Sequence, residues 1–223
     1  MKRALRMSGW TLIGAAGLVL VFLVYQLFVT DLINARSQAT AAVELEGFLI
    51  ERRATTTTTG VAREPELLTE PVVPVGEPLA RIEIPKIKLD DVVFEGTERA
   101  TLKLGPGHMP ETPIPGQPGN AVISGHRTTY GRPFYDLDQL VVGDEIRVET
   151  ALGVNTYEVR EVLIVAPTDL WVAESIPWAW LTLTTCHPRF SAAQRLVIQA
   201  ELVDGPNLDY IQTLLASASL SAG

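Results

Sequence analysis

Cysteine is nearly absent from this sequence, which contains only Cys186 among its 223 residues. A single cysteine cannot form an internal disulfide, so its thiol is either a small buried hydrophobe or a reactive group. The three histidines are scattered and lack paired ligand spacing, so we expect no metal ion and no other cofactor. Basic residues are also in deficit, because the formal net charge is -8. This charge argues against nucleic acid as a partner, since surfaces that bind nucleic acid are positively charged.

Charged residues are missing from residues 10–29, which follow three basic residues within positions 1–6. As a helix, this run rises about 30 Å, the thickness of the hydrocarbon core of a bilayer. Because basic flanks stay in the cytoplasm, we expect residues 1–6 to be cytoplasmic and residues 7–30 to form a transmembrane signal-anchor helix. The sequence thus predicts a single-pass protein of the plasma membrane, whose remaining residues are extracytoplasmic.

A cleaved signal peptide is the alternative explanation of this apolar run. Ala39-Thr40-Ala41 has the small-x-small pattern of a cleavage site. However, the run is longer than the usual apolar region of a signal peptide, and the triplet lies about ten residues beyond the end of the run. The length therefore favours an uncleaved anchor.

Residues 31–78 separate the apolar run from the alternating pattern that begins at residue 79. The apolar residues of 31–53 lie near helical spacing. After them come Thr55–Thr59, Gly60 and four prolines between positions 65 and 78, a composition typical of an extended linker. We therefore expect an extracytoplasmic stalk, whose first part could be helical.

Period-two alternation begins at residue 79 and predicts a β-domain over residues 79–204. Short alternating runs bounded by glycine and proline recur along this region, a pattern typical of closed or nearly closed β-barrels. The proline-rich segment 108–119 is expected to be a long loop. Residues 205–223 form a tail that could be partly helical. The expected strands cover residues 80–84, 87–94, 121–124, 144–149, 156–165, 180–186 and 195–202.

Cys186 ends one alternating run, and Arg195 begins the next. If residues 187–194 form the loop of a hairpin, these two side chains lie opposite each other and project from the same face. The parity of the first run agrees, because Leu181 and Leu183 share the face opposite Cys186. The sequence therefore predicts a thiol and a guanidinium side by side at a strand end.

These residue types permit nucleophilic acyl transfer. The thiolate is the reactive form of cysteine, and a nearby imidazolium or guanidinium favours it. A histidine can protonate a departing amine. Arginine, which stays protonated, can stabilise an oxyanion. We favour His126 as the acid because it follows an apolar run and a glycine at a strand end, with His108 and His187 as competitors.

Structural explanations of the same residues are simpler. A lone cysteine at a strand end is more often packed and inert than nucleophilic. A lone arginine on a mixed strand face is usually solvated. A tethered, non-catalytic β-domain that binds a surface protein or a glycan is therefore the alternative function.

The segment Thr182-Leu183-Thr184-Thr185-Cys186 resembles the T-L-x-T-C signature of sortases, the membrane-anchored cysteine transpeptidases of bacterial cell surfaces. Arg195 follows at the spacing of the essential arginine of that family, and Ser124-Gly125-His126-Arg127 resembles the segment that carries its histidine. The similarity covers about residues 79–203. Four segments are similar to class E sortases in particular: 105–108, 116–120, 125–131 and 185–191.

This resemblance implies a closed sortase-type β-barrel of about eight strands with short helices. It implies that Cys186, His126 and Arg195 are catalytic, that Thr185 contacts the substrate and that Tyr130 lies near the substrate groove. The implied reaction cleaves an L-P-x-T-G-like sorting signal, for class E L-A-x-T-G, between Thr and Gly. The implied partners are surface proteins that carry such signals and an amine acceptor on a cell wall precursor or a pilin.

Overall fold

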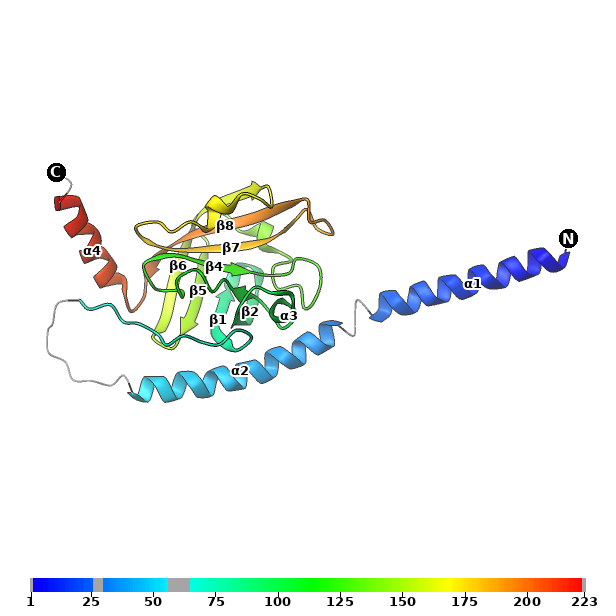
Figure 1. Cartoon of the computed structure of the whole chain (residues 1–223), viewed down its shortest axis with the longest axis horizontal. Coiled ribbons are helices and arrows are strands. Elements are labelled where there is room, and N and C mark those ends of the chain that lie inside the picture. The colour runs from blue at the N-terminus through cyan, green and yellow to red at the C-terminus, as the bar shows by residue number, and fades with distance from the viewer. Residues whose placement is uncertain (1, 26–29, 56–64, 222–223) are drawn as a thin grey trace.

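Eight strands close into a β-barrel in the computed structural model of this chain, which describes residues 2–25, 30–55 and 65–221 (Figure 1). The order around the barrel is β1-β2-β3-β4-β7-β8-β6-β5, which confirms the predicted fold class of the β-domain. The strands are β1 (Pro78–Ile84), β2 (Leu89–Glu95), β3 (Gly107–His108), β4 (Gly119–Ser124), β5 (Glu145–Thr150), β6 (Gly153–Val165), β7 (Ala179–His187) and β8 (Gln194–Asp204). The helices are α1 (Lys2–Val24), α2 (Thr30–Thr55), α3 (Arg99–Leu102) and α4 (Leu208–Ser221), with short 3-10 helices η2 (Pro85–Ile87), η3 (Leu137–Gln139) and η4 (Leu170–Ala173).

Alternating apolar residues fill the barrel and fix the register of its strands. Leu181 and Leu183 of β7 are fully buried, and Ile198 of β8, also fully buried, pairs with Leu183. Burying one leucine side chain contributes roughly 1.5–3 kcal/mol. A slip by one residue would turn these side chains outward, so the register of the β7–β8 hairpin is strongly specified.

Strands β4 and β7 run parallel, whereas most neighbouring strands of the barrel are antiparallel. Gly119 pairs with Ala179 at one end, and Ser124 pairs with Thr184 at the other. Parallel strands need a long crossover connection. Here that connection contains β5 and β6, which form the other side of the barrel (Figure 1). Because both strands run the same way, the residues that follow them meet at one rim.

The predicted loop over residues 108–119 overlaps a two-residue strand, β3, which pairs with β2 and β4. Two residues are too few for an alternating pattern, so sequence periodicity could not reveal this strand. His108 is buried, with Nδ1 2.8 Å from Oε2 of Glu95 and Nε2 2.9 Å from the carbonyl oxygen of Pro113. The imidazole ring therefore ties β2, β3 and the following loop together.

The predicted transmembrane helix over residues 7–30 coincides in part with α1, while residues 26–29 lie outside the described residues. Within the parts of the chain that the structure describes, none of the helices combines the length and the apolar character needed to cross a membrane. The structure therefore does not support this prediction.

Helix α2 lies along the barrel beside β1 and β2, in the region for which the sequence predicts a stalk (Figure 1). Leu45 and Leu49 are buried in a cluster with Val92 of β2. The side chain of Gln38 accepts a hydrogen bond from the backbone N–H of Val92 at 2.7 Å and donates one to its carbonyl at 3.1 Å. Gln38 thus satisfies the backbone N–H and carbonyl of Val92, the two groups that a neighbouring strand would otherwise pair with. Residues 30–55 are a packed helix, and residues 56–64 of the predicted stalk lie outside the described residues.

The segment before β1 and the C-terminal tail also contact the barrel domain. The side chain of Asn207 accepts a hydrogen bond from the backbone N–H of Leu68 at 2.9 Å and donates one to its carbonyl at 3.0 Å. Beyond it, α4 forms the helical part expected in the tail, and its Ile211 is fully buried.

Asp91 of β2 lies beneath α2, in the wall of a cavity that Glu46 and Arg81 also line. Burial, and then the charge of Asp90, raises the pKa of Asp91 from 3.8 to about 6. The carboxyl group of Asp91 therefore binds its proton more tightly in the folded protein than in the unfolded chain. The folded protein loses stability as the pH rises from 3.8 to about 6 and Asp91 becomes charged. At about 1.36 kcal/mol per pKa unit, the loss reaches about 3 kcal/mol at neutral pH and above.

We expect Asp91→Asn to raise the free energy of unfolding by up to about 3 kcal/mol at neutral pH, and by progressively less under acidic conditions, because asparagine has no charge to bury. Urea denaturation of both proteins across this pH range measures the difference. Asp90→Asn is the contrasting variant, because it removes the hydrogen bond from Arg81 that lowers the pKa of Asp90 and removes only the smaller cause of the shift at Asp91, so it should give no such gain. A gain from Asp91→Asn that is the same at every pH would contradict the assignment.

Candidate active site

One rim of the barrel brings together the three residues that the sequence predicts to be catalytic. Cys186 pairs with Arg195 across the β7–β8 hairpin, so the predicted register is confirmed. His126 lies two residues beyond Ser124, and Cys186 lies two residues beyond Thr184, the partner of Ser124. His126 and Cys186 therefore lie at the same level of two neighbouring chain segments.

Two hydrogen bonds continue this pairing past the end of β4. The N–H of Gly125 donates to the carbonyl of Thr184 at 3.1 Å, and Oγ1 of Thr185 donates to the carbonyl of Gly125 at 2.7 Å. A side chain at position 125 would clash, because a Cβ there would lie 2.5 Å from Cδ2 of the buried Phe134. Gly125, the residue before His126, is thus held by hydrogen bonds to β7 on one side and by close packing against Phe134 on the other. Thr185 itself is buried, and its predicted substrate contact stays a prediction.

Cys186 is half-buried on the outer face of β7, opposite the fully buried Leu181 and Leu183. A cysteine that served only as packing would lie with the leucines inside the barrel. The half-buried position leaves the thiol within reach of a substrate at the rim, which is where a reactive cysteine is expected.

Arg195 is the second residue of β8, and its guanidinium is folded over the preceding loop. Its Nη1 donates to the carbonyls of Ala192 at 3.1 Å and of Gln194 at 3.0 Å. Because arginine stays protonated, these contacts place a permanent positive charge at the strand end opposite Cys186. Such a charge can stabilise both a thiolate and a developing oxyanion.

His126 is half-buried and has one unsatisfied ring nitrogen. Among the described residues, its Nε2 is one of two buried side-chain polar atoms without a hydrogen-bond partner, the other being Nε1 of Trp178. Such atoms are rare in folded proteins, because they forgo a hydrogen bond that water would supply. Burial, and then the charge of Arg99, lowers the pKa of His126. An imidazole with a free nitrogen and a lowered pKa is suited to exchanging a proton with a substrate.

Tyr130 packs on His126, with ring centroids 5.2 Å apart. Tyr130, Gly131 and Arg132 all have positive φ angles of 51°, 77° and 53°, which strains the two residues that are not glycine. Asp31 of α2 holds this turn, because its carboxylate accepts hydrogen bonds from the N–H of Gly131 at 3.2 Å and from Nη2 of Arg132 at 3.0 Å. Helix α2 therefore supports the residue that packs on the candidate acid. The predicted place of Tyr130 near the substrate groove stays a prediction.

The two competing histidines have other contacts. His108 is 1% exposed, and both of its ring nitrogens have partners on β2 and the following loop. Nδ1 of His187 lies 3.5 Å from Nη1 of Arg127, and it is the acceptor because a guanidinium only donates. The geometry therefore favours His126 as the acid. Within the described residues, none of the histidines belongs to a cluster that could hold a metal ion.

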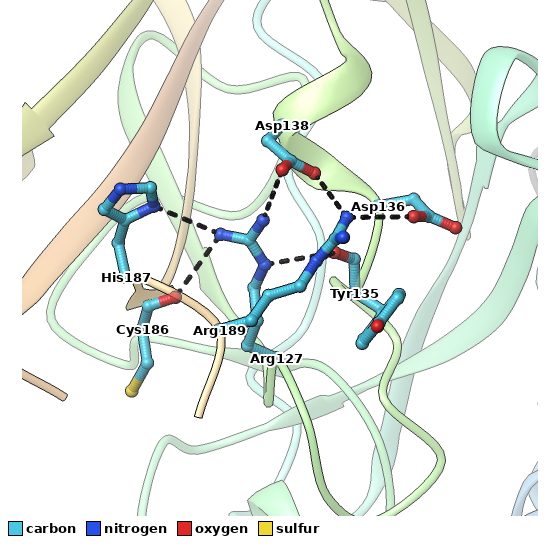
Figure 2. Close-up of polar contacts among 7 residues, drawn as sticks. All are labelled: Arg127, Tyr135, Asp136, Asp138, Cys186, His187 and Arg189. Atoms are coloured by element: carbon cyan, nitrogen blue, oxygen red, sulfur yellow. Dashed lines mark hydrogen bonds and ion pairs between the residues drawn. The ribbon is translucent and has the colours of Figure 1, made fainter. Parts of the chain in front are cut away.

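Arg127 is the functional candidate that sequence reasoning missed. Its side chain is only 2% exposed, and its guanidinium reaches the carbonyl oxygen of Cys186 at 3.5 Å (Figure 2). Its place next to His126 in the sequence was the one available signal. An arginine gives no periodic pattern from which its burial could be predicted.

Comparison with known proteins identifies the family of this chain. The family model of the sortase domain matches residues 82–203, and the chain therefore belongs to the sortase family. Members of this family are cysteine transpeptidases, and the chain is most like those of class E.

Two sortases of class E and one sortase D5 are among the relatives of this chain. Sortase SrtE1 of Streptomyces coelicolor is 30% identical over 218 residues, which cover 90% of this chain and 58% of that protein. This chain thus spans less than two thirds of the length of that relative. Sortase E from Streptomyces avermitilis has a solved structure that is 35% identical, with a TM-score of 0.55 over 59% of this chain and 91% of that one. The sortase D5 transpeptidase of Clostridium perfringens is 26% identical, with a TM-score of 0.63 over 76% of this chain and 99% of that one.

If Cys186 and His126 act as a thiolate and an imidazolium, the rate should be bell-shaped against pH, because only one of the ionisation states is active. We expect Arg99→Gln to move the limb that His126 sets to higher pH, since the charge of Arg99 lowers the pKa of His126. Added salt should reduce the difference, because Arg99 is exposed and its charge is screened. Steady-state rates of both proteins from acid to alkaline pH measure these limbs. A flat profile, or limbs unmoved in the variant at low salt, would contradict this role.

Proposed function

We propose that this chain is a cysteine transpeptidase that cleaves a peptide bond and transfers the resulting acyl group to an amine. The observation that carries this proposal is the pairing that brings Cys186, His126 and Arg195 to one rim of the barrel. Membership of the sortase family supports it. The half-buried thiol and the unpartnered Nε2 of His126 supply a nucleophile and a site for proton exchange.

The first half of the reaction forms a thioester. The thiolate of Cys186 attacks the carbonyl carbon of the substrate, and the carbonyl electron pair moves to oxygen, where the guanidinium of Arg195 stabilises the negative charge. As the C–N bond breaks, the imidazolium of His126 donates its proton to the departing amine. The enzyme now carries the acyl group on sulfur, and His126 is neutral.

The second half transfers the acyl group. The nitrogen of an amine acceptor attacks the thioester carbon, and His126 accepts the proton that this nitrogen loses. The C–S bond then breaks, which restores the thiolate and the imidazolium. The same histidine acts as acid and then as base, so one residue with a lowered pKa serves both halves.

The substrate that we propose is an L-P-x-T-G-like sorting signal, with L-A-x-T-G as the preferred form, cleaved between Thr and Gly. The similarity to class E sortases supports this choice. We propose an amine of a cell wall precursor, or a lysine of a pilin, as the acceptor. The carriers of the signal are then surface proteins.

A peptide assay tests the proposal directly. The purified chain is incubated with a fluorogenic L-A-x-T-G peptide, an L-P-x-T-G peptide and a scrambled control, each with a glycine or diamine acceptor, and the products are identified by mass spectrometry. We expect cleavage between Thr and Gly and a product joined to the acceptor. Binding of the signals without turnover would instead favour a tethered, non-catalytic binding domain.

Variants separate the roles of the residues in this assay. Cys186→Ala should abolish turnover, because no other cysteine is present. Arg195→Lys keeps the charge but loses the planar set of donors, so we expect kcat to fall by about 100-fold to 1000-fold. Arg147→Lys is the matched control, because Arg147 lies on β5 in exposed pairs with Glu83 and Glu145, and its rate should equal that of the parent. Turnover that survives in Cys186→Ala would overturn the mechanism.

We also propose that the barrel works outside the cytoplasm, at the plasma membrane. The basic residues before the uncharged run 10–29 support this placement. Because Cys186 is the sole cysteine, a membrane-impermeant maleimide can report its location in intact cells, with Cys186→Ala as the background control. We expect labelling before lysis. Labelling that requires lysis would contradict the placement.

A further inference from the structure

We propose that Arg127 is a positioning residue that fixes the separation between His126 and Cys186, together with Asp138 and Arg189. The inference rests on the proposed function, since it concerns the same two reacting groups. Figure 2 shows the two arginines converging on the carboxylate of Asp138, one of them from the segment that follows His126 and the other from the segment that follows Cys186.

The guanidinium of Arg127 contacts three acceptors in two other segments of the chain. Its Nε donates to the carbonyl of Tyr135 at 3.0 Å, and its Nη2 lies 2.9 Å from Oδ2 of Asp138. Its Nη1 lies 3.5 Å from the carbonyl oxygen of Cys186. One planar group thus connects the residue after His126, the segment around η3 and the peptide that carries the nucleophile.

Burial makes this arrangement rigid. The side chain of Arg127 is 2% exposed, and a guanidinium in such a place keeps its charge because arginine is not deprotonated in proteins. A buried charge without partners is strongly unfavourable, so the guanidinium cannot leave this set of acceptors without a large loss of stability. The position of the Cys186 peptide relative to Arg127 is therefore narrowly limited.

Arg189 completes the connection from the other side. It lies three residues after Cys186, and its Nη2 lies 2.9 Å from Oδ1 of Asp138, while its Nε donates to the carbonyl of Tyr135 at 3.3 Å. Its guanidinium also stacks over the ring of Tyr135 at 4.2 Å. Asp138 and Tyr135 therefore each contact Arg127, from the segment that follows His126, and Arg189, from the segment that follows Cys186. The contacts therefore form a closed loop that passes through the peptide of Cys186 and through Arg127, the residue that follows His126.

No hydrogen bond between the side chains of His126 and Cys186 is present among the described contacts, so their separation depends on the backbones that carry them. Misplacement of a reacting group by about 1 Å can lower a rate by about 100-fold. A lysine at position 127 keeps the charge but has a single nitrogen, which cannot reach the three acceptors at once. Loss of these bonds should therefore affect the chemical step more than substrate binding.

We expect Arg127→Lys to lower kcat by about 10-fold to 100-fold with KM changed by less than about threefold. Asp138→Asn, which keeps the shape of the side chain, should lower kcat by about threefold to tenfold. Arg147→Lys is the control that keeps both constants at the parent values. Thermal unfolding of each variant shows whether the protein remains folded at the temperature of the assay.

A second readout does not need turnover. The rate at which iodoacetamide alkylates the single thiol, measured against pH, reports the pKa of Cys186. Arg127→Lys should move the midpoint to higher pH, because a thiolate further from the imidazolium is less stabilised. A role in folding alone would lower the thermal midpoint and leave this alkylation profile unchanged.

The outcomes separate this inference from the proposed function. If the parent turns over no sorting peptide, the proposed function fails, and the alkylation profiles still decide the positioning role: a moved midpoint supports it and superposable profiles overturn it. If Arg127→Lys does not fold, Asp138→Asn decides in the same way through kcat. Parent-like kcat in every folded variant overturns the inference.

Discussion

The parallel pairing of β4 with β7 is the constraint on which the candidate site depends. It brings the segment that follows β4 to the rim where β7 ends, and so it places His126 at the level of Cys186. The β7–β8 hairpin then adds Arg195 opposite the thiol. Both pairings are specified by the same buried residues, because Leu181 and Leu183 of β7 face the core while Cys186 faces outward. The candidate nucleophile, the candidate acid and the guanidinium of Arg195 are thus held at one rim by the packing of the barrel.

Support from outside the barrel strands completes the rim. Asp31 of α2 holds the turn that carries Tyr130, and the ring of Tyr130 packs on His126. Beside the candidate nucleophile, Arg127 and Asp138 connect the segment that follows His126 with the segment that carries Cys186 (Figure 2). Preorganised groups need not rearrange during the reaction, and this lowers the cost of reaching the transition state. The site therefore depends on supporting contacts that extend beyond the sortase domain of residues 82–203, to Asp31 of α2.

The sequence allowed the local part of this site to be predicted. The pairing of Cys186 with Arg195 is a hairpin between adjacent runs, and alternation alone fixed its register. The approach of His126 to Cys186 depends on contacts such as that between Gly125 and Thr185, which lie 60 positions apart in the sequence. No periodicity encodes such a parallel pair, and the resemblance to a family supplied it. β3 was too short to leave a pattern. The packing of α2 and the burial of Arg127 were missed because both depend on partners that only the tertiary structure brings near.

The proposed reaction requires His126 and Cys186 to lie close enough for the charge of one to affect the pKa of the other. An NMR titration of the imidazole of His126, in the parent and in Cys186→Ala, measures this coupling, and the chain has only three histidines to assign. We expect two inflections in the parent, the second as the thiol ionises, and a single inflection in the variant. Superposable curves for the two proteins would contradict the coupling.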